Sequence, residues 1–309
     1  MRAPVGAPPK NRFDATQWQR DSMFNPSRST ARERSRFRSL SALMFISAVA
    51  AGTMAACSKD SSTEPASPQL VYGPEQTLGS GTARVYVTLD AAGKPSTLGV
   101  ALSENALTNL PQMPMGGGNP SAVMLMLALP QAAKATGFDH VMLDWNPAGH
   151  EPEHVYTLPH FDFHFYTASQ AEQMAIMPSD PQFEAKLEKM PAEQYRPAGL
   201  FKLPGGVPMM GAHWVDPTSP ELLPAPSNKQ FTGTFIYGSY DGKFIFWEPM
   251  ITKAHIESAK SVAGNAIVTA LKTPVQYQRA GYYPDRYTVR WDASAKEYQI
   301  SMDGLKPQR

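Results

Sequence analysis

The chain has 309 residues, of which 42% are hydrophobic and 18% are charged, and its formal net charge is +1. That length and composition suffice for a globular hydrophobic core. The single cysteine, Cys57, excludes an internal disulfide framework and any CxxC metal or redox motif. The near-neutral total hides an uneven distribution, since residues 1–40 contain nine Lys/Arg and three Asp/Glu, a net charge of +6.

Residues 1–56 have the pattern of a bacterial export signal. The basic start is followed at 41–56 by "SALMFISAVAAGTMAA", which carries no charge. This segment is too short and too rich in small residues for a stable membrane span. The sequence "MAAC" at 54–57 resembles a lipobox, with Met in place of the usual Leu. The resemblance implies cleavage before Cys57 and its lipidation; an ordinary signal peptide followed by a coincidental cysteine is the alternative.

The same region predicts a location. Ser58 after the cysteine resembles lipoproteins sorted to an outer membrane, so we expect a lipoprotein facing the periplasm or the cell surface. The membrane would be its partner through the lipid on Cys57. Met23 precedes a compact basic start, and we hypothesise that it is the true initiator. Residues 57–69 are polar and Pro/Ser-rich, which predicts a flexible tether.

Removing the leader's charge of +6 from the total of +1 leaves about −5 for the chain from Cys57 onwards. A mildly acidic chain lacks the basic surface that nucleic-acid binding requires. We therefore exclude nucleic acid as a partner, and we leave homo-oligomerisation open.

Residues 70–309 are predicted to form a single β-rich domain. Alternating, β-branched segments at 83–90 and 96–103 predict a hairpin around "AAGK", and a short helical turn follows before Pro111. Residues 122–130 form an apolar run whose periodicity fits a strand or a helix. Further strands are expected at 139–147, 154–159 and 160–168, hairpins over 231–251 and 282–304, and short helices at 169–177, 180–190 and 252–260. The absence of βαβ alternation favours a mainly β (α+β) fold, an antiparallel sandwich or barrel with short helices in its connections.

The stretch "PHFDFHFY" at 159–166 carries the most chemistry. On a strand, three Phe would share the face that enters the core, and His160, Asp162 and His164 would share the other. Imidazole and carboxylate together suit Zn, Fe, Mn, Ni or Cu(II). Two alternatives stay open: an acid–base site without metal, and the wet face of a half-buried strand.

Strand geometry limits which of these residues can share an ion. His160 and His164 would lie about 13 Å apart along a straight strand, so the strand can more easily supply a pair such as Asp162 and His164. His213, flanked by glycine in "MMGAHW", and Glu248, in the apolar strand "FIFWEPM", are candidates to complete the site. We therefore predict a divalent-metal site from His160, Asp162, His164, His213 and Glu248.

The remaining candidates are weaker. His150 and His154 fall in a predicted loop, and His255 falls on a predicted surface helix, so all three are expected to be solvated. The sequence has no Gly-x-Ser-x-Gly elbow, no phosphate-binding glycine loop and no dinucleotide fingerprint. Its 16 methionines are more typical of core filler than of copper handling.

Four stretches together resemble a known family: "GTARVYVTLDAAGKPSTLGVALSENALTNLP", "LDWNPAGHEPEHVYTLPHFDFHFY", "MGAHWVDP" and "FIFWEPMIT". They are similar to exported bacterial proteins classed as a domain of unknown function, whose named representative is a Thermus protein controlled by a sigma-E/anti-sigma-E envelope-stress system. The resemblance would span most of residues 70–255, including all five metal candidates. It implies an exported, stress-linked role and supplies no reaction.

Whether the protein is an enzyme therefore stays open. If it is, the metal would activate water or oxygen. The alternative is a non-enzymatic envelope interaction or stress-related structural module without metal.

Overall fold

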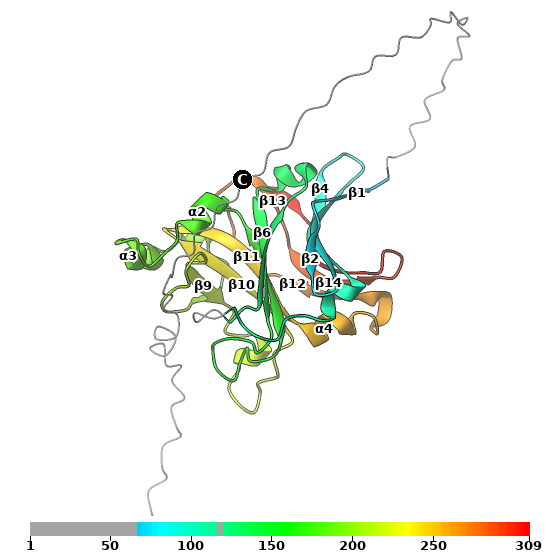
Figure 1. Cartoon of the computed structure of the whole chain (residues 1–309). Helices are drawn as coiled ribbons and strands as arrows, with labels where there is room; N and C mark the ends of the chain where they lie inside the picture. The colour runs from blue at the N-terminus through cyan, green and yellow to red at the C-terminus, as the bar shows by residue number, and fades with distance from the viewer. Residues whose placement is uncertain (1–66, 116–119) are drawn as a thin grey trace, which may run out of the picture.

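The computed structural model describes residues 67–115 and 120–309 (Figure 1). The leader, the lipidation candidate Cys57 and most of the predicted tether lie outside the described residues. Within the described part, no helix is both long enough and apolar enough to cross a membrane.

Seven strands form a first antiparallel sheet in the order β1-β3-β4-β15-β14-β12, with β2 paired to β3. The strands are β1 (Gln69–Tyr72), β2 (Gln76–Leu78), β3 (Gly81–Leu89), β4 (Pro95–Ser103), β12 (Ala266–Ala270), β14 (Arg286–Asp292) and β15 (Glu297–Asp303). The two predicted hairpins, β3–β4 and β14–β15, are both present and are joined through the pairing of β4 with β15.

A second antiparallel sheet of seven strands has the order β5-β6-β7-β11-β10-β9-β8. The strands are β5 (Val123–Ala128), β6 (His140–Asn146), β7 (His160–Tyr166), β8 (Phe201–Lys202), β9 (Ala212–Val215), β10 (Gly233–Tyr240) and β11 (Lys243–Thr252). The ambiguous apolar run at 122–130 is thus a strand. The predicted turn between β10 and β11 is confirmed, since Asp241 and Gly242 both have positive φ, as a tight hairpin requires. A small separate pair joins β13 (Gly281–Tyr283) to β16 (Lys306–Gln308).

Short helices occupy the connections. They are η1 (Glu104–Leu107), η2 (Gln131–Thr136), α2 (Gln170–Met174), α3 (Phe183–Glu188), η3 (Glu193–Tyr195), η4 (Pro220–Leu222), α4 (Lys253–Ser258) and η5 (Ala263–Asn265). Ser169 and Glu172 form a reciprocal capping box that starts α2. The strand predicted at 154–159 is wrong, because these residues form turns and bends and His154 has a φ of 67°, which interrupts an extended chain.

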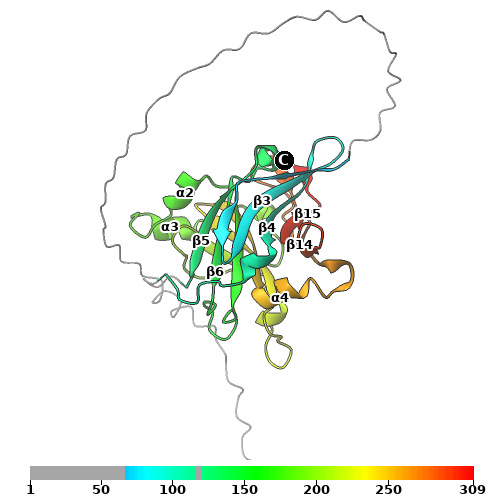
Figure 2. The same ribbon diagram turned by 45° about the vertical axis from the view of Figure 1, so that its right-hand side comes forward.

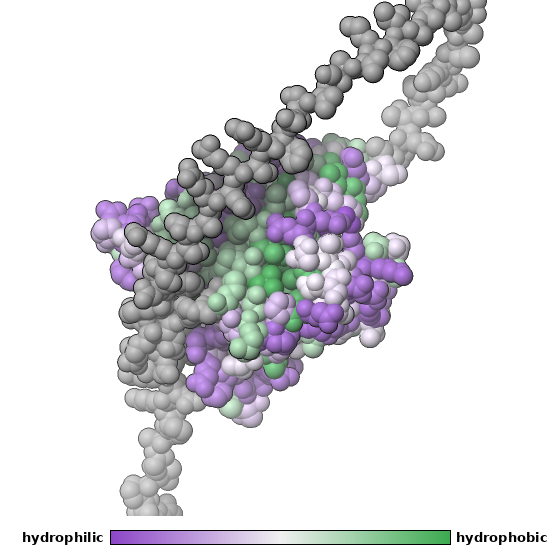
Figure 3. All heavy atoms as spheres, in the orientation of Figure 1, coloured by the Kyte–Doolittle hydropathy of each residue, from purple (hydrophilic) through white to green (hydrophobic). Residues whose placement is uncertain are grey.

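The two sheets face each other, as Figures 1 and 2 show. Phe161, Phe163 and Phe165 of β7 are fully buried in a shared core with residues of the first sheet. Their first-sheet neighbours in this core include Val85, Val87, Leu98, Val100, Val289 and Ile300. Figure 3 shows hydrophobic residues in the middle of one face of the molecule, with hydrophilic ones to the right and below. The described strands form two open seven-stranded sheets and one two-stranded pair, which confirms the predicted mainly β, sandwich-like fold.

The outer face of the second sheet is covered as well. Residues of the α2 and α3 region pack against Tyr166 and Phe246 on this face, and both helices lie beyond the second sheet in Figure 1. Strand β7 lies between β6 and β11, and all its residues are buried. The alternative of a half-buried strand with a wet polar face is therefore wrong. Residues of the β6–β7 loop and of segment 203–210 line the cavity next to the histidine face and cover it.

Candidate metal centre

Strand register places the polar residues of three neighbouring strands on one face. Asp144 of β6 stands opposite Asp162 of β7, and the register of β7 with β11 sets Glu248 beside His164. Side chains two residues apart on a strand share a face, so Asp162 and His164 point the same way. His213 reaches this face from β9, which pairs with β10 at Gly238. These residues form two separate clusters.

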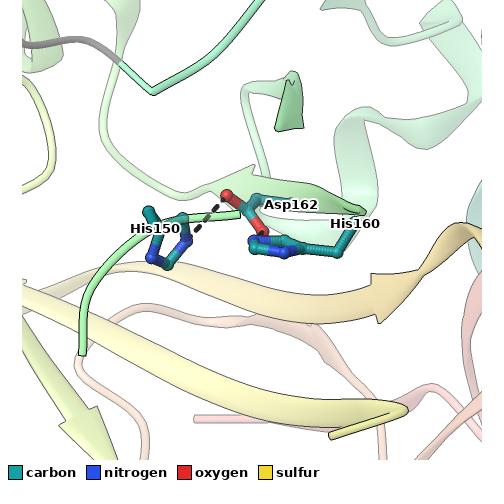
Figure 4. A group of neighbouring side chains, drawn as sticks. All are labelled: His150, His160 and Asp162. Atoms are coloured by element: carbon teal, nitrogen blue, oxygen red, sulfur yellow. Dashed lines mark ion pairs between the residues drawn. The ribbon is translucent and has the colours of Figure 1, made fainter. Parts of the chain in front are cut away.

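The first cluster consists of His150, His160 and Asp162 (Figure 4). Nε2 of His150 lies 3.4 Å from Oδ2 of Asp162, and Nε2 of His160 lies 3.2 Å from Oδ1 of the same carboxylate. One ligand atom from each residue lies within 4.8 Å of the other two. His160 is fully buried, while His150 comes from the loop between β6 and β7 and is partly exposed.

Backbone carbonyls orient both imidazoles of this cluster. Nδ1 of His160 donates to the carbonyl oxygen of Leu158 at 2.7 Å, and Nδ1 of His150 donates to that of Glu151 at 2.7 Å. A carbonyl can only accept, so the protonated nitrogen of each neutral ring is Nδ1. The lone pair of each Nε2 then faces Asp162, and Nε2 of His160 also lies 3.4 Å from Nδ2 of Asn146.

A second hydrogen-bond relay fixes the carboxylate itself. Nδ2 of Asn146 donates to Oδ2 of Asp162 at 2.7 Å, and Oγ of Ser121 donates to Oδ1 of Asn146 at 3.0 Å. Asn146 and Asp162 are both buried. The geometry of the cluster is therefore set by partners outside it, which is how proteins hold metal ligands in place.

The second cluster consists of His164, His213 and Glu248, whose ligand atoms also lie within 4.8 Å of one another. Nε2 of His164 lies 3.4 Å from Oε1 of Glu248, and its Nδ1 lies 3.3 Å from Oδ2 of Asp144. His164 therefore stands between two buried carboxylates, one on each neighbouring strand.

Both clusters open into one cavity of about 440 Å³, a volume within the usual range for ligand sites. His150, Asp162, His164, His213 and Glu248 line it, whereas His160 is fully buried and is not among the lining residues. Its apolar wall includes Met124, Leu203, Val207, Met209, Met210 and Ile236. No lysine or arginine occurs among the described residues that line it.

Burial and mutual charge shift the ionisation of the second cluster. Burial raises the pKa of Glu248 to about 8. Burial opposes charge on His164, but Glu248 and Asp144 outweigh it and raise the pKa of His164 to about 9. Both shifts keep a proton between His164 and Glu248 at neutral pH. Burial, reinforced by His164, lowers the pKa of His213 to about 3, so His213 is neutral.

In the first cluster the carboxylate stays charged. Burial would raise the pKa of Asp162, but the adjacent His160 and His150 outweigh it and hold the pKa well below its usual range. Burial also opposes charge on His150, and Asp162 reverses this and raises the pKa of His150. An ionised Asp162 is the state that can bind a cation.

Several buried carboxylate oxygens lack a hydrogen-bond donor among the described residues. They are both oxygens of Asp144, Oδ1 of Asp162 and Oε2 of Glu248. Two of them, Oδ2 of Asp144 and Oδ1 of Asp162, still lie 3.3 and 3.2 Å from a histidine nitrogen. A buried polar atom without a partner costs about 1–3 kcal/mol, and more when the group is charged. Such atoms require a counterpart, and a bound cation is one that the donor set can accommodate.

The five residues predicted from the sequence all lie in this region, but they do not form one site. His160 and His164 belong to different clusters, in keeping with their separation along the strand. The strand supplies a pair of residues two apart to one cluster, His160 with Asp162, where Asp162 with His164 was the example given from the sequence.

Two further residues were missed by sequence reasoning. His150 was expected to be a solvated loop residue, but its side chain is only partly exposed and its Nε2 faces Asp162. The loop folds back there, and the His150 amide donates to the carbonyl of Tyr156 at 3.0 Å. Gly149 permits the fold, with a φ of 70° and no room for a Cβ against Tyr156. The only available signal was the density of histidines in this stretch. Asp144 gave no signal beyond its place in a predicted strand.

The other histidines have ordinary environments. The ring of His140 stacks on Tyr166 at 4.9 Å, and its Nε2 lies 2.8 Å from Oε1 of Gln173. His154 is exposed, as expected. His255 lies on α4, where its amide bonds to the capping Thr252, and burial lowers its pKa. None of these three belongs to either cluster.

Residues 90–145 match a family model described as TTHB210-like, hypothetical protein TTHB210. The match confirms the resemblance to a family of unknown function. It runs from the β3–β4 turn to Trp145 of β6, so it contains Asp144 and ends before the residues of both clusters. Neither the curated proteins nor the solved structures contain a match to this chain.

Proposed function

We propose that the protein binds a divalent transition-metal ion through His150, His160 and Asp162. One observation carries the proposal: two imidazoles, each held at Nδ1 by a backbone carbonyl, aim Nε2 at the same buried carboxylate. When the two histidines are neutral, the lone pair of each Nε2 faces a negatively charged oxygen of Asp162, and the lone pair and the oxygen repel each other. A cation between them turns that repulsion into coordination.

The distances fit a metal better than direct hydrogen bonds. Two ligands about 2.0–2.1 Å from a tetrahedral ion lie about 3.4 Å apart. Nε2 of His160 and His150 lie 3.2 and 3.4 Å from Asp162 oxygens, whereas hydrogen bonds to ionised groups are usually about 2.7–2.9 Å long. Two imidazoles and one carboxylate suit Zn, Fe, Mn, Ni or Cu(II), while Ca²⁺ and Mg²⁺ prefer oxygen ligands.

Three protein ligands would leave coordination positions facing the cavity. Such an open site is typical of catalytic metals, which activate water or oxygen, and closed four-ligand sites are typical of structural ones. The wall of the cavity would accept an apolar molecule beside the ion. We leave the reaction unassigned.

The direct test is the metal content of the full chain, purified without an affinity tag, stripped with chelator and dialysed against zinc. We expect His150→Ala and Asp162→Asn each to lose zinc from this site, while His154→Ala, an exposed histidine of the same loop, keeps the wild-type content. Wild-type zinc content in both His150→Ala and Asp162→Asn would sink the proposal and favour an envelope module without metal.

We further propose that the protein acts outside the cytoplasm as an outer-membrane lipoprotein anchored at Cys57. The support is the basic, apolar and lipobox-like order of residues 1–57. Cys57→Ser should abolish incorporation of radiolabelled fatty acid and release the protein from the membrane fraction. Unchanged labelling of that variant contradicts the anchor.

A further inference from the structure

We infer that His164, His213 and Glu248 bind a second metal ion, so that the cavity holds two ions at separate sites. The inference deepens the proposed function, because both sites share one cavity, but its three ligands are distinct from those of the first site.

The geometry repeats that of the first cluster. Nε2 of His164 lies 3.4 Å from Oε1 of Glu248, which is about the spacing of two ligands on one tetrahedral ion. His213 places a ring nitrogen within 4.8 Å of both ligand atoms. The three side chains come from β7, β9 and β11, strands fixed by the register of the sheet.

The second cluster also has an orienting partner. Oδ2 of Asp144 lies 3.3 Å from Nδ1 of His164 and is itself absent from the cavity lining. A carboxylate behind a histidine, with the metal on the opposite ring nitrogen, is a common arrangement in metal sites. Asp144 acts here as a positioning residue, as the carbonyls of Leu158 and Glu151 do in the first cluster.

Each cluster has its own buried carboxylate that can bind a cation. Asp162 belongs to the first cluster and Glu248 to the second, and no lysine or arginine lines the cavity among the described residues. Without a metal ion, Glu248 and His164 hold protons at neutral pH, and a cation bound to the second cluster would displace them.

Further carboxylates in the cavity lining also favour cations. Glu151 and Glu153, on the loop that carries His150, are among the lining residues. Carboxylates that line a cleft raise the local concentration of positive ions and lower that of anions.

The two sites should fill independently. Asp162 and His164 are two residues apart on β7, so their Cα atoms are about 6.6 Å apart, and no ligand belongs to both clusters. Removing a ligand from one cluster should therefore leave the other able to bind its ion.

Zinc stoichiometry of the full chain tests this inference. Equilibrium dialysis of chelator-stripped protein, followed by elemental analysis, should give two zinc ions per wild-type chain. His213→Ala and the isosteric Glu248→Gln should each retain one, and so should His150→Ala and Asp162→Asn. The double variant Asp162→Asn/Glu248→Gln should retain none, and His154→Ala should retain two. Circular dichroism and thermal melting identify any variant that fails to fold, and Glu248→Gln preserves side-chain volume if His213→Ala does not fold.

The outcomes separate the two proposals. One zinc ion in the wild type, unaffected by Glu248→Gln and lost in Asp162→Asn, overturns the second ion and keeps the first. One zinc ion in the wild type that is lost in Glu248→Gln and retained in Asp162→Asn overturns the first site and keeps the second. Loss of all zinc from a folded Glu248→Gln protein overturns the independence of the sites, and no zinc in the wild type overturns both proposals.

Discussion

The two faces of β7 are equally inaccessible to solvent, yet they meet different surroundings. Phe161, Phe163 and Phe165 enter the core between the sheets, whereas Asp162 and His164 line a cavity on the other side of the same strand, where His160 is fully buried. Burial on the first face removes apolar surface from water and stabilises the fold. Burial on the second face costs free energy unless the polar groups find partners. Burial of the apolar face therefore stabilises the fold, whereas burial of the polar face stabilises it only if the polar side chains have partners. Those partners are what indicates the function of the polar face.

Truncation on the apolar face should give the largest effect. Phe163→Ala should lower the free energy of unfolding by about 3–5 kcal/mol, because it leaves a cavity between two sheets that cannot easily close. Urea denaturation measures the loss. The folded fraction should keep its zinc stoichiometry, since no cluster ligand changes. A loss below about 1 kcal/mol would mean that this face is not the anchor of the strand.

Substitution on the polar face should act through the metal. At a zinc concentration of 100 times its dissociation constant, each filled site should raise the free energy of unfolding by about 2.7 kcal/mol. Asp162→Asn should lose the contribution of one site, which thermal melting with and without zinc can resolve. If zinc raised the melting temperature of Asp162→Asn as much as that of the wild type, Asp162 would not be a metal ligand. The polar face would then be buried for a reason other than metal binding.

Orienting residues should give smaller effects than ligands. Asn146→Ala removes the donor to Oδ2 of Asp162 and leaves all three ligands of the first cluster, so its zinc affinity should fall by about 10–100-fold. Asp144→Asn should do the same to the second cluster by releasing Nδ1 of His164. Competition with a chromophoric chelator measures both. Loss of the ion altogether would identify these residues as ligands.

Lowering the pH should reduce the affinity of the second site for zinc in a graded way. The pKa of His164 is raised to about 9, mainly by Glu248 and Asp144 against the opposing effect of burial, so at pH 7 this nitrogen holds a proton that zinc must displace. Binding at pH 7 should release at least one proton from His164 and Glu248, and affinity should fall by at least about tenfold for each pH unit below 9. A pH indicator in weak buffer reports the release. No proton release would contradict coordination by His164.

Local sequence patterns predicted much of this fold. Alternation placed the Phe and His residues on opposite faces of one strand, and Asp241-Gly242 marked a hairpin that the structure contains. These features depend on neighbours along the chain, since side-chain direction on a strand has a period of two. The same reasoning failed at 154–159, where an alternating segment is held in turns by a left-handed His154.

By itself the sequence determined which residues face together on each strand, and it drew His160, Asp162, His164, His213 and Glu248 into one candidate set. Only the tertiary structure divided that set into two clusters and added His150 to one of them. The pairing of β7 with β11 joins segments far apart in the chain, and the loop carrying His150 folds back beside the sheet that this pairing builds. Strand periodicity is a local property of the backbone, whereas strand order and loop closure depend on long-range contacts that no short pattern encodes.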